Sequence, residues 1–298
     1  MTSEGFHGLK ALLRSVKSTV DVPIADQRAG IDGLATMLPV AEGVTIEPVM
    51  AGGVPAEWHL VADTDPSDGA ILLLHGGGYV IGSPASHRAM ASLLAVSAEV
   101  PVLVLDYRLA PEHPCPAAID DAMAAWRWLL DDVKVDLWAT GWCGDSAGGG
   151  LALAALQRAK AEGVERPARV ALISPWLDLT GTAPAITANA DVDAVLDSAL
   201  LAAWATAYAG DLALEDPIVS PLFGDLTGLP PLFVQATDAE VLVDDATRLA
   251  AAVDAAGGTV TLEVLPDLLH AWHMFRGAAP ECDAGIADVA GFLRTRIR

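Results

Sequence analysis

The sequence has few basic residues, and this shortage excludes several partners. Its 17 lysines and arginines stand against 39 aspartates and glutamates, giving a formal net charge of −22 at pH 7. So acidic a chain repels the phosphates of nucleic acids and of anionic lipid headgroups. We therefore expect no nucleic-acid partner.

Cysteines and long apolar runs are also scarce. The three cysteines, Cys115, Cys143 and Cys282, form no spaced disulfide framework, which favours a reducing compartment. No segment reaches the roughly 18 consecutive apolar residues that span a bilayer, and the N-terminus lacks a secretory pattern. We expect a cytoplasmic protein without a membrane span.

Apolar residues are abundant, and their arrangement predicts the fold. The chain has 298 residues, of which 53% are hydrophobic, enough for one large core in a single domain over residues 1–298. Apolar runs alternate with helical patterns such as Ala117 to Asp131 and Gly149 to Ala161, which is typical of a parallel α/β sheet with helices on both faces. About eight strands are predicted, at Val44 to Val49, Trp58 to Ala62, Ala70 to Leu74, Val100 to Leu105, Leu137 to Cys143, Val170 to Ser174, Leu232 to Ala236 and Thr259 to Leu265.

Ser146 lies in the sequence Gly144-Asp145-Ser146-Ala147-Gly148, directly after the apolar run from Asp136 to Cys143. A sharp strand-to-helix turn needs small residues two positions before and after its apex so that strand and helix can pass closely. The pattern predicts that Ser146 is a nucleophile, with its hydroxyl lifted clear of the sheet edge.

A glycine-rich loop, His75-Gly76-Gly77-Gly78-Tyr79, follows the strand-like run at Ala70 to Leu74. Such a loop can point backbone N–H groups at the oxyanion of an acyl-transfer intermediate. We expect these donors to be Gly77, Gly78 and Ala147. A phosphate-binding loop is disfavoured because no lysine and Ser/Thr pair follows the glycines. His75 is expected to hold the loop in shape.

Two histidines in the C-terminal part, His270 and His273, are candidates for the general base. His270 directly follows the last strand and a short loop, where the order nucleophile, acid, base expects it. No third ligand stands at metal spacing, so no zinc site is expected. The acid must lie between nucleophile and base. After the strand at Leu232 to Ala236, spacing alone does not separate Asp238 from Glu240.

Several of these motifs, taken together, resemble the hormone-sensitive-lipase family of α/β-hydrolases, the bacterial family IV carboxylesterases. The similarity runs from about Val44 to the C-terminus. Its motifs are His75 to Gly78, Asp106 to His113, Gly144 to Gly149 and Ser174-Pro175-Trp176. In this family the acid begins a motif of the form acid-x-Leu-x-Asp. Glu240 to Asp244 fits that form, so the resemblance implies Glu240, where many relatives have aspartate.

The resemblance also implies a helical cap, built from residues of about 1–43 and 180–215, that offers an apolar wall to an acyl chain. It implies a serine esterase acting on short- to medium-chain acyl esters, with no cofactor. It further implies a homodimer formed through the last strand, Thr259 to Leu265, whose apolar edge needs a cover.

Two other functions remain open. An amidase, thioesterase or deacetylase would use the same triad, because one triad serves all acyl transfers. A non-catalytic ligand receptor of this fold would have lost the base, and the presence of His270 argues against it.

Overall fold

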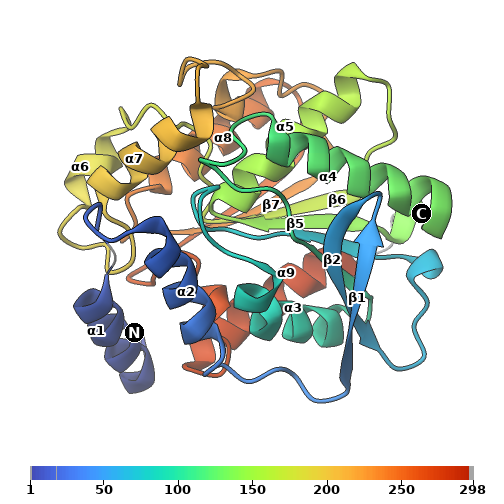
Figure 1. Ribbon diagram of the computed structural model, residues 1–298, viewed down its shortest axis with the longest axis horizontal. Coiled ribbons are helices and arrows are strands. Elements are labelled where there is room, and N and C mark those ends of the chain that lie inside the picture. The colour runs from blue at the N-terminus through green and yellow to red at the C-terminus, as the bar shows by residue number, and fades with distance from the viewer. Residues whose placement is uncertain (1, 18, 295–298) are drawn as a thin grey trace.

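A sheet of eight strands runs through the centre of the computed structural model, which describes residues 2–17 and 19–294 (Figure 1). The strand order is β1-β2-β4-β3-β5-β6-β7-β8, and only the pairs β1–β2 and β2–β4 are antiparallel. The mostly parallel sheet of about eight strands is therefore confirmed. The strands are β1 (Val44–Ala51), β2 (Val54–Val61), β3 (Ile71–Leu74), β4 (Val102–Leu105), β5 (Gly141–Asp145), β6 (Arg169–Ile173), β7 (Leu232–Thr237) and β8 (Val260–Leu265).

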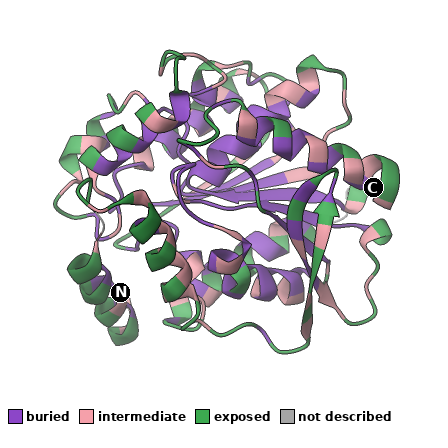
Figure 2. Ribbon diagram, in the orientation of Figure 1, coloured by how far each residue is buried: buried purple, intermediate pink, exposed green. Residues whose placement is uncertain are grey.

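Helices cover both faces of the sheet. On one face lie α3 (Pro84–Ala98) and α9 (Pro280–Arg294); on the other lie α4 (Ala117–Trp128), α5 (Ala147–Ala161) and α8 (Val243–Ala255) (Figure 1). Ile71 and Leu73 of β3 pack toward α3 and α9, whereas the alternate residues Leu72 and Leu74 join the core on the other face. The central strands are consequently buried on both sides (Figure 2).

Several element boundaries differ from the prediction, among them the start of β2, which lies at Val54 and not at Trp58. The run at Leu137 to Cys143 begins as a 3₁₀ turn, Leu137–Ala139, because the Asp136 carboxylate caps it by accepting from Trp138 N; the strand starts only at Gly141. The helix predicted to end at Asp131 turns π-helical over Leu129–Val133. The helix predicted from Gly149 already starts at Ala147, next to Ser146.

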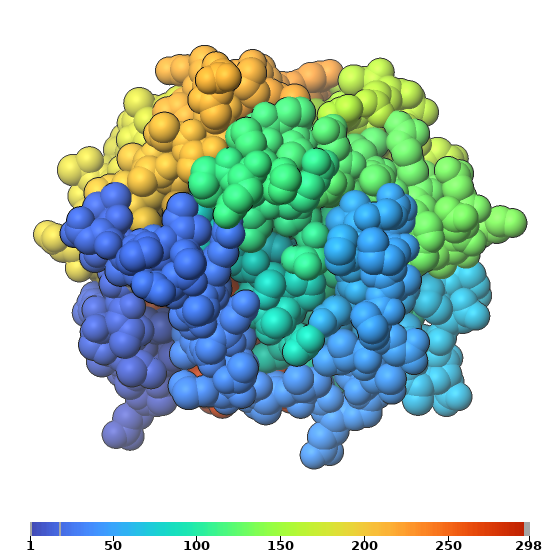
Figure 3. All heavy atoms as spheres, viewed as in Figure 1, coloured from blue at the N-terminus to red at the C-terminus, as the bar shows by residue number. Residues whose placement is uncertain are grey.

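Four further helices lie outside this layered arrangement. The chain begins with α1 (Glu4–Val16) and α2 (Ile24–Ala35), and α6 (Pro184–Ala188) and α7 (Ser198–Ala209) lie between β6 and β7. The two segments touch, as the blue and yellow atoms of the space-filling view show (Figure 3). Arg14 donates to Val192 O at 2.9 Å and Lys17 to Asp193 O at 3.0 Å. Among the described helices, none has the length and apolar character to cross a bilayer.

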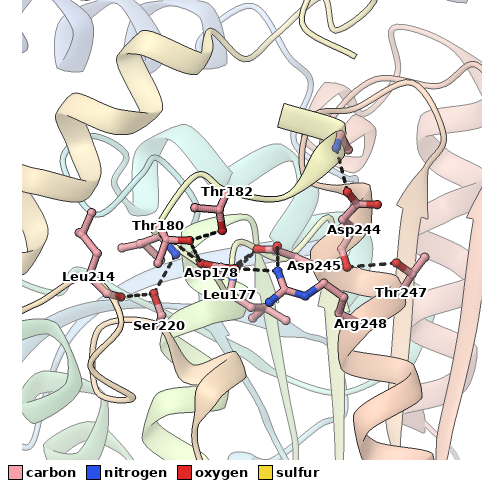
Figure 4. A network of polar contacts seen from close by, with 12 residues as sticks. Leu177, Asp178, Thr180, Thr182, Leu214, Ser220, Asp244, Asp245, Thr247 and Arg248 are labelled. Atoms are coloured by element: carbon pink, nitrogen blue, oxygen red, sulfur yellow. Dashed lines mark hydrogen bonds and ion pairs between the residues drawn. The ribbon is translucent and has the colours of Figure 1, made fainter. Parts of the chain in front are cut away.

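A polar network ties together the two ends of the segment that carries α6 and α7 (Figure 4). Ser220 Oγ accepts from Leu179 N at 2.8 Å and donates to Leu214 O at 2.6 Å. Beside it, Asp245 accepts from the backbone that leads into the segment, and Arg248 pairs with Asp178 at 2.7 Å. Burial raises the pKa of Asp245 to about 7, although these backbone donors lower it.

Candidate active site

Ser146 forms the sharp turn between β5 and α5. Its φ of 52° is a left-handed conformation rarely adopted by a residue with a side chain. A Cβ added at Gly144 would lie 2.3 Å from Gly148 O, and one at Gly148 would lie 1.9 Å from Leu74 O. The two glycines thus permit the close crossing that keeps Ser146 at the apex.

The glycine loop lies beside this turn, after β3. Gly77 and Gly78 have φ values of 113° and 61°, and Gly77 O accepts from Val80 N and Ile81 N. No acceptor in the described part of the chain pairs with the N–H groups of Gly77, Gly78 or Ala147, where α5 begins. These donors are therefore available to an anion.

A buried carboxylate joins the glycine loop to the Ser146 turn. Asp145 Oδ1 accepts from Gly76 N at 3.0 Å and lies 3.1 Å from His87 Nε2. Burial alone would raise the pKa of Asp145, but the neighbouring imidazoles, His87 above all, hold it below its ordinary value. The sequence analysis missed this pair because His87 lies in α3, far along the chain from Asp145.

His75 holds the glycine loop, as expected. Its Nδ1 lies 2.8 Å from Gly76 O, and its ring stacks on Tyr107, whose hydroxyl donates to His75 O at 2.7 Å. Burial, reinforced by His87, lowers the pKa of His75 to about 3, so the ring is neutral.

The motif from Asp106 to His113 also supports this loop, since Ala110 N donates to Tyr79 O at 2.9 Å. Asp106 and Arg108, the charged residues of this motif that follow β4, are both exposed. Arg108 pairs with Asp121 in α4 at 2.7 Å rather than with Asp106.

Glu240 and His270 meet directly. His270 Nδ1 lies 2.6 Å from Glu240 Oε2, while Thr237 N donates to Glu240 Oε1 at 3.0 Å. The rival carboxylate, Asp238, is exposed and accepts from Asp267 N at 2.8 Å. Ser146 and His270 are both buried, 6% and 5% exposed.

Three carboxylates act on His270. Burial lowers its pKa, but the hydrogen bond and charge of Glu240, with the charges of Asp193 and Asp145, outweigh burial and raise the pKa above 6.5. A base with such neighbours becomes positive readily, and the carboxylates stabilise the imidazolium.

His273 has a separate environment. Its Nε2 lies 2.8 Å from Gln235 Oε1, and burial lowers its pKa to about 3. It packs against Trp272 as a neutral core residue. Within the described ranges, no group of three His, Cys, Asp or Glu side chains is placed to hold a metal ion.

Helix α7 lies against the glycine loop. A Cβ on Gly78 would come 2.1 Å from the Trp204 ring, so the indole packs directly on the loop. In and just before α7, Leu196, Leu200, Trp204 and Tyr208 are buried, whereas Ala199 and Ala203 are exposed.

Comparison with known proteins gives the family. Residues 71–274 match the sequence model of a family described as having the alpha/beta hydrolase fold, so the chain belongs to that class. An acetyl-hydrolase of Streptomyces hygroscopicus is 43% identical over 251 residues, covering 83% of this chain and 82% of the relative. An esterase of Acinetobacter venetianus is 35% identical, covering 95% and 93%.

Solved structures narrow the class. A crystal structure of an esterase from the bacterial hormone-sensitive-lipase family superposes with a TM-score of 0.95 at 38% identity, covering both chains completely, 100% each. The protein is a member of the hormone-sensitive-lipase family of α/β-hydrolases and a carboxylic-ester hydrolase.

Proposed function

We propose that the protein hydrolyses esters through an acyl-enzyme on Ser146, with His270 as general base and Glu240 as the acid that orients it. The observation that carries the proposal is the 2.6 Å contact between His270 Nδ1 and Glu240 Oε2. It leaves Nε2 as the nitrogen that can take a proton from the Ser146 hydroxyl.

The reaction has two halves. Ser146 Oγ attacks the ester carbonyl carbon while His270 takes its proton, and the oxyanion binds the N–H groups of Gly77, Gly78 and Ala147. The intermediate collapses, the bond to the alcohol oxygen breaks, and His270 returns the proton to the leaving alcohol. Water then attacks the acyl-enzyme with His270 again as base, releasing the acid and restoring Ser146.

The substrates we propose are esters with short to medium acyl chains. Two observations support small acyl groups: the Trp204 ring packs directly on Gly78, and the relative with 43% identity is named an acetyl-hydrolase. The same name favours a second candidate function, removal of the acetyl group from the acetyl ester of a larger alcohol. Turnover of one acetyl group presented as ester, thioester and amide would separate esterase, thioesterase and amidase activity.

The proposed arrangement has three further parts. We infer that residues of about 1–43 and 180–215 form a cap over Ser146, supported by the contacts of Arg14 and Lys17 with the second segment. We infer a homodimer through β8. We also infer a cytoplasmic location, which is supported by the three buried, free cysteines.

The serine is tested by Ser146→Ala. Because the nucleophile of a triad contributes on the order of a millionfold to turnover, hydrolysis of p-nitrophenyl acetate should fall to background. Circular dichroism and the melting temperature should match the wild type. A tenth of wild-type turnover in the variant would overturn the assignment, and mass spectrometry of a phosphonylated wild-type enzyme should locate the adduct on Ser146.

A further inference from the structure

The turn that carries Glu240 is held by side chains from another part of the chain. Asn189, which follows α6, donates through Nδ2 to Asp238 O at 2.9 Å and to Glu240 O at 2.8 Å. The next backbone group, Val241 N, donates to Asp193 Oδ2 at 3.0 Å. Three backbone polar groups of the turn are thus paired with two side chains of the segment between β6 and β7.

Asp193 is itself fixed in place. It is 4% exposed, and its Oδ1 accepts from Val195 N at 2.8 Å and Leu196 N at 2.9 Å. One carboxylate oxygen therefore folds its own loop, and the other reaches the Glu240 turn. Lys17, at the end of α1, donates from its ammonium group to Asp193 O and so helps to hold the same loop.

The length of the glutamate side chain makes this support important. Glu240 has one more rotatable bond than an aspartate, so the position of its carboxylate depends more strongly on the backbone that carries it. Its Oε1 is held by Thr237 N on one side of the turn. On the other side, the carbonyls of Asp238 and Glu240 and the Val241 N–H are held by Asn189 and Asp193.

We propose that Asn189 and Asp193 are positioning residues, which hold the Asp238–Val241 turn so that the Glu240 carboxylate meets His270 Nδ1. The segment between β6 and β7 then does more than cover the site: it completes the support of the acid. This inference rests on the proposed function, since it assigns a role relative to the proposed triad.

The charge of Asp193 adds a second effect. Three carboxylates act on His270: Glu240, on the loop after β7; Asp193, on the segment after α6; and Asp145, at the end of β5. On the histidine's own loop, Asp267 is paired with Lys10 of α1. Removing the Asp193 charge removes one of the three carboxylates that raise the pKa of His270, so that pKa should fall.

Matched controls exist in the same segment. Asp197 caps α7 by accepting from Leu200 N at 2.9 Å, and Ser198 donates to Ile186 O at 2.9 Å. Both bonds lie within the segment and reach no part of the Glu240 turn. Asp197→Asn and Ser198→Ala therefore remove a charge and a hydrogen bond of similar kind without touching the acid.

The kinetic experiment compares four variants with p-nitrophenyl acetate. Asn189→Ala and Asp193→Asn should lower kcat about tenfold to a hundredfold with little change in KM, because small displacements of catalytic groups cost that much. In Asp193→Asn, the amide would face Val241 N with a donor, and the acidic limb of the kcat/KM profile should move to lower pH. Asp197→Asn and Ser198→Ala should retain the wild-type kcat, and the acidic limb of their kcat/KM profiles should lie at the wild-type pH.

A second measurement does not depend on turnover. The proton shared by His270 Nδ1 and Glu240 gives a low-field NMR signal, which should broaden or vanish in Asn189→Ala and Asp193→Asn and persist in both controls. If the wild type proved not to hydrolyse esters, this signal would still report whether the two residues hold the pair. The two failures are thereby distinguishable.

The variant Asn189→Ala also serves as a control for misfolding. Asn189 is only half-buried, so its truncation leaves no internal cavity and should permit folding even if Asp193→Asn does not. Wild-type kcat together with an unchanged low-field signal in Asn189→Ala would overturn the proposal. Equal losses of kcat in Asn189→Ala and Ser198→Ala would also overturn it, because the effect would then be one of general stability.

Discussion

At the scale of single residues, the environment of His270 is consistent with the general-base role proposed for this buried imidazole. Burial, reinforced at His75 by His87, lowers the pKa values of His75 and His273 to about 3, far too low to accept a proton near neutral pH. His270 is equally enclosed, yet Glu240, Asp193 and Asp145 raise its pKa. The difference among the three rings lies in their carboxylate neighbours, because desolvation acts on all of them.

The first prediction concerns Glu240. Glu240→Gln keeps a hydrogen-bond acceptor but removes the charge that stabilises the imidazolium, so turnover should fall about a hundred- to ten-thousandfold. Since the Glu240 carboxylate raises the pKa of His270, the acidic limb of the kcat/KM profile should also move to lower pH. In the wild type this limb should lie above pH 6.5, because the base must be neutral and its pKa is raised.

Asp238→Asn is the matched comparison for this experiment. Asp238 is exposed and bonds to Asp267 N, so the variant should lose less than tenfold in turnover. If Asp238→Asn were the damaging change and Glu240→Gln mild, the roles assigned to the two carboxylates would be reversed.

Residues in local motifs could be predicted from the sequence, and residues that act across the fold could not. Ser146 and the glycines of the loop after β3 stand in short patterns whose backbone geometry requires them. The sequence left Asp238 and Glu240 unresolved because both follow the same strand, and only the resemblance favoured Glu240. Asn189 and Asp193 gave no signal, since their partners lie about 50 residues away, as the separations of 51 and 48 show.

At the scale of elements, α2 is linked to the glycine loop through one side chain. Arg28 donates through Nε to Val80 O at 2.8 Å and through NH2 to Ala110 O at 3.0 Å. It also forms a two-pronged pair with Glu112, which lowers the pKa of that carboxyl to about 2. Arg28 thereby joins the N-terminal helices to both loops that shape the oxyanion donors.

The second prediction is that Arg28→Ala lowers kcat several-fold to about tenfold. The exposed ion pair contributes only about 0–1 kcal/mol to stability, so the melting temperature should hardly change. The loss of two carbonyl contacts should instead loosen the loop that carries Gly77 and Gly78, the proposed oxyanion donors, since such a donor contributes about 3–4 kcal/mol to the transition state.

Steady-state kinetics with the same chromogenic acetate would test this effect. Arg127→Ala is the control, because Arg127 forms a similar exposed pair with Glu162, between α4 and the end of α5. Equal kcat values in the two variants would mean that Arg28 has no bearing on the loop.

Element type was easier to predict than element boundaries. All eight strands were found, and buried β-branched and leucine runs such as Ile71–Leu74 and Val102–Leu105 are typical of parallel strands covered on both faces. The start of β5 was predicted too early because the apolar residues Leu137-Trp138-Ala139 resemble a strand. The Asp136 side chain instead caps them as a 3₁₀ helix, in which Trp138 is exposed. A side-chain cap of this kind competes locally with the strand and leaves no mark in the hydrophobic pattern.

At the scale of the whole molecule, the buried histidines make the free energy of unfolding fall as the pH decreases. Burial lowers the pKa of His59 to about 4 and the pKa values of His75 and His273 to about 3. In the unfolded chain each ring binds a proton near pH 6.5, so between these values the unfolded state holds more protons than the folded state. Stability contributed by neutral burial is complete above pH 6.5 and is lost as the pH falls.

Asp245 opposes this trend. Burial raises its pKa to about 7, so the folded state holds its proton more tightly than the unfolded state does, and its contribution is lost as pH rises. The three buried histidines outweigh Asp245 and Asp106, whose pKa burial also raises, and leave a net loss of stability toward acid. Each group contributes up to about 1.4 kcal/mol per pH unit within its range.

The third prediction is that the urea midpoint falls steadily as pH decreases from about 6.5 toward 4. His59→Leu should make this dependence shallower, because neither ring nitrogen of His59 has a hydrogen-bond partner in the described part of the chain. His7→Leu, on the exposed face of α1, should leave the slope unchanged. An identical slope in the wild type and His59→Leu would show that this ring does not titrate between the two states.

The fourth prediction concerns assembly. Strand β8 is the last in the sheet, pairs only with β7 among the described strands, and carries Val264 with 38% of its surface exposed. An open apolar edge favours pairing, and a two-fold partner would cover both edges with one contact. The charge of −22 per chain opposes association, but salt near physiological strength screens charges beyond about 8 Å.

Sedimentation at micromolar protein should therefore give a dimer at moderate salt and more monomer at low salt. Val264→Asp places a charge on the open edge and should yield monomer, and it is a cleaner test than a change at Leu262, which also packs against the core. A single monomeric species of the wild type at moderate salt would refute the dimer. A dimer that survives Val264→Asp would move the contact away from β8, because two carboxylates brought together at a paired edge repel each other.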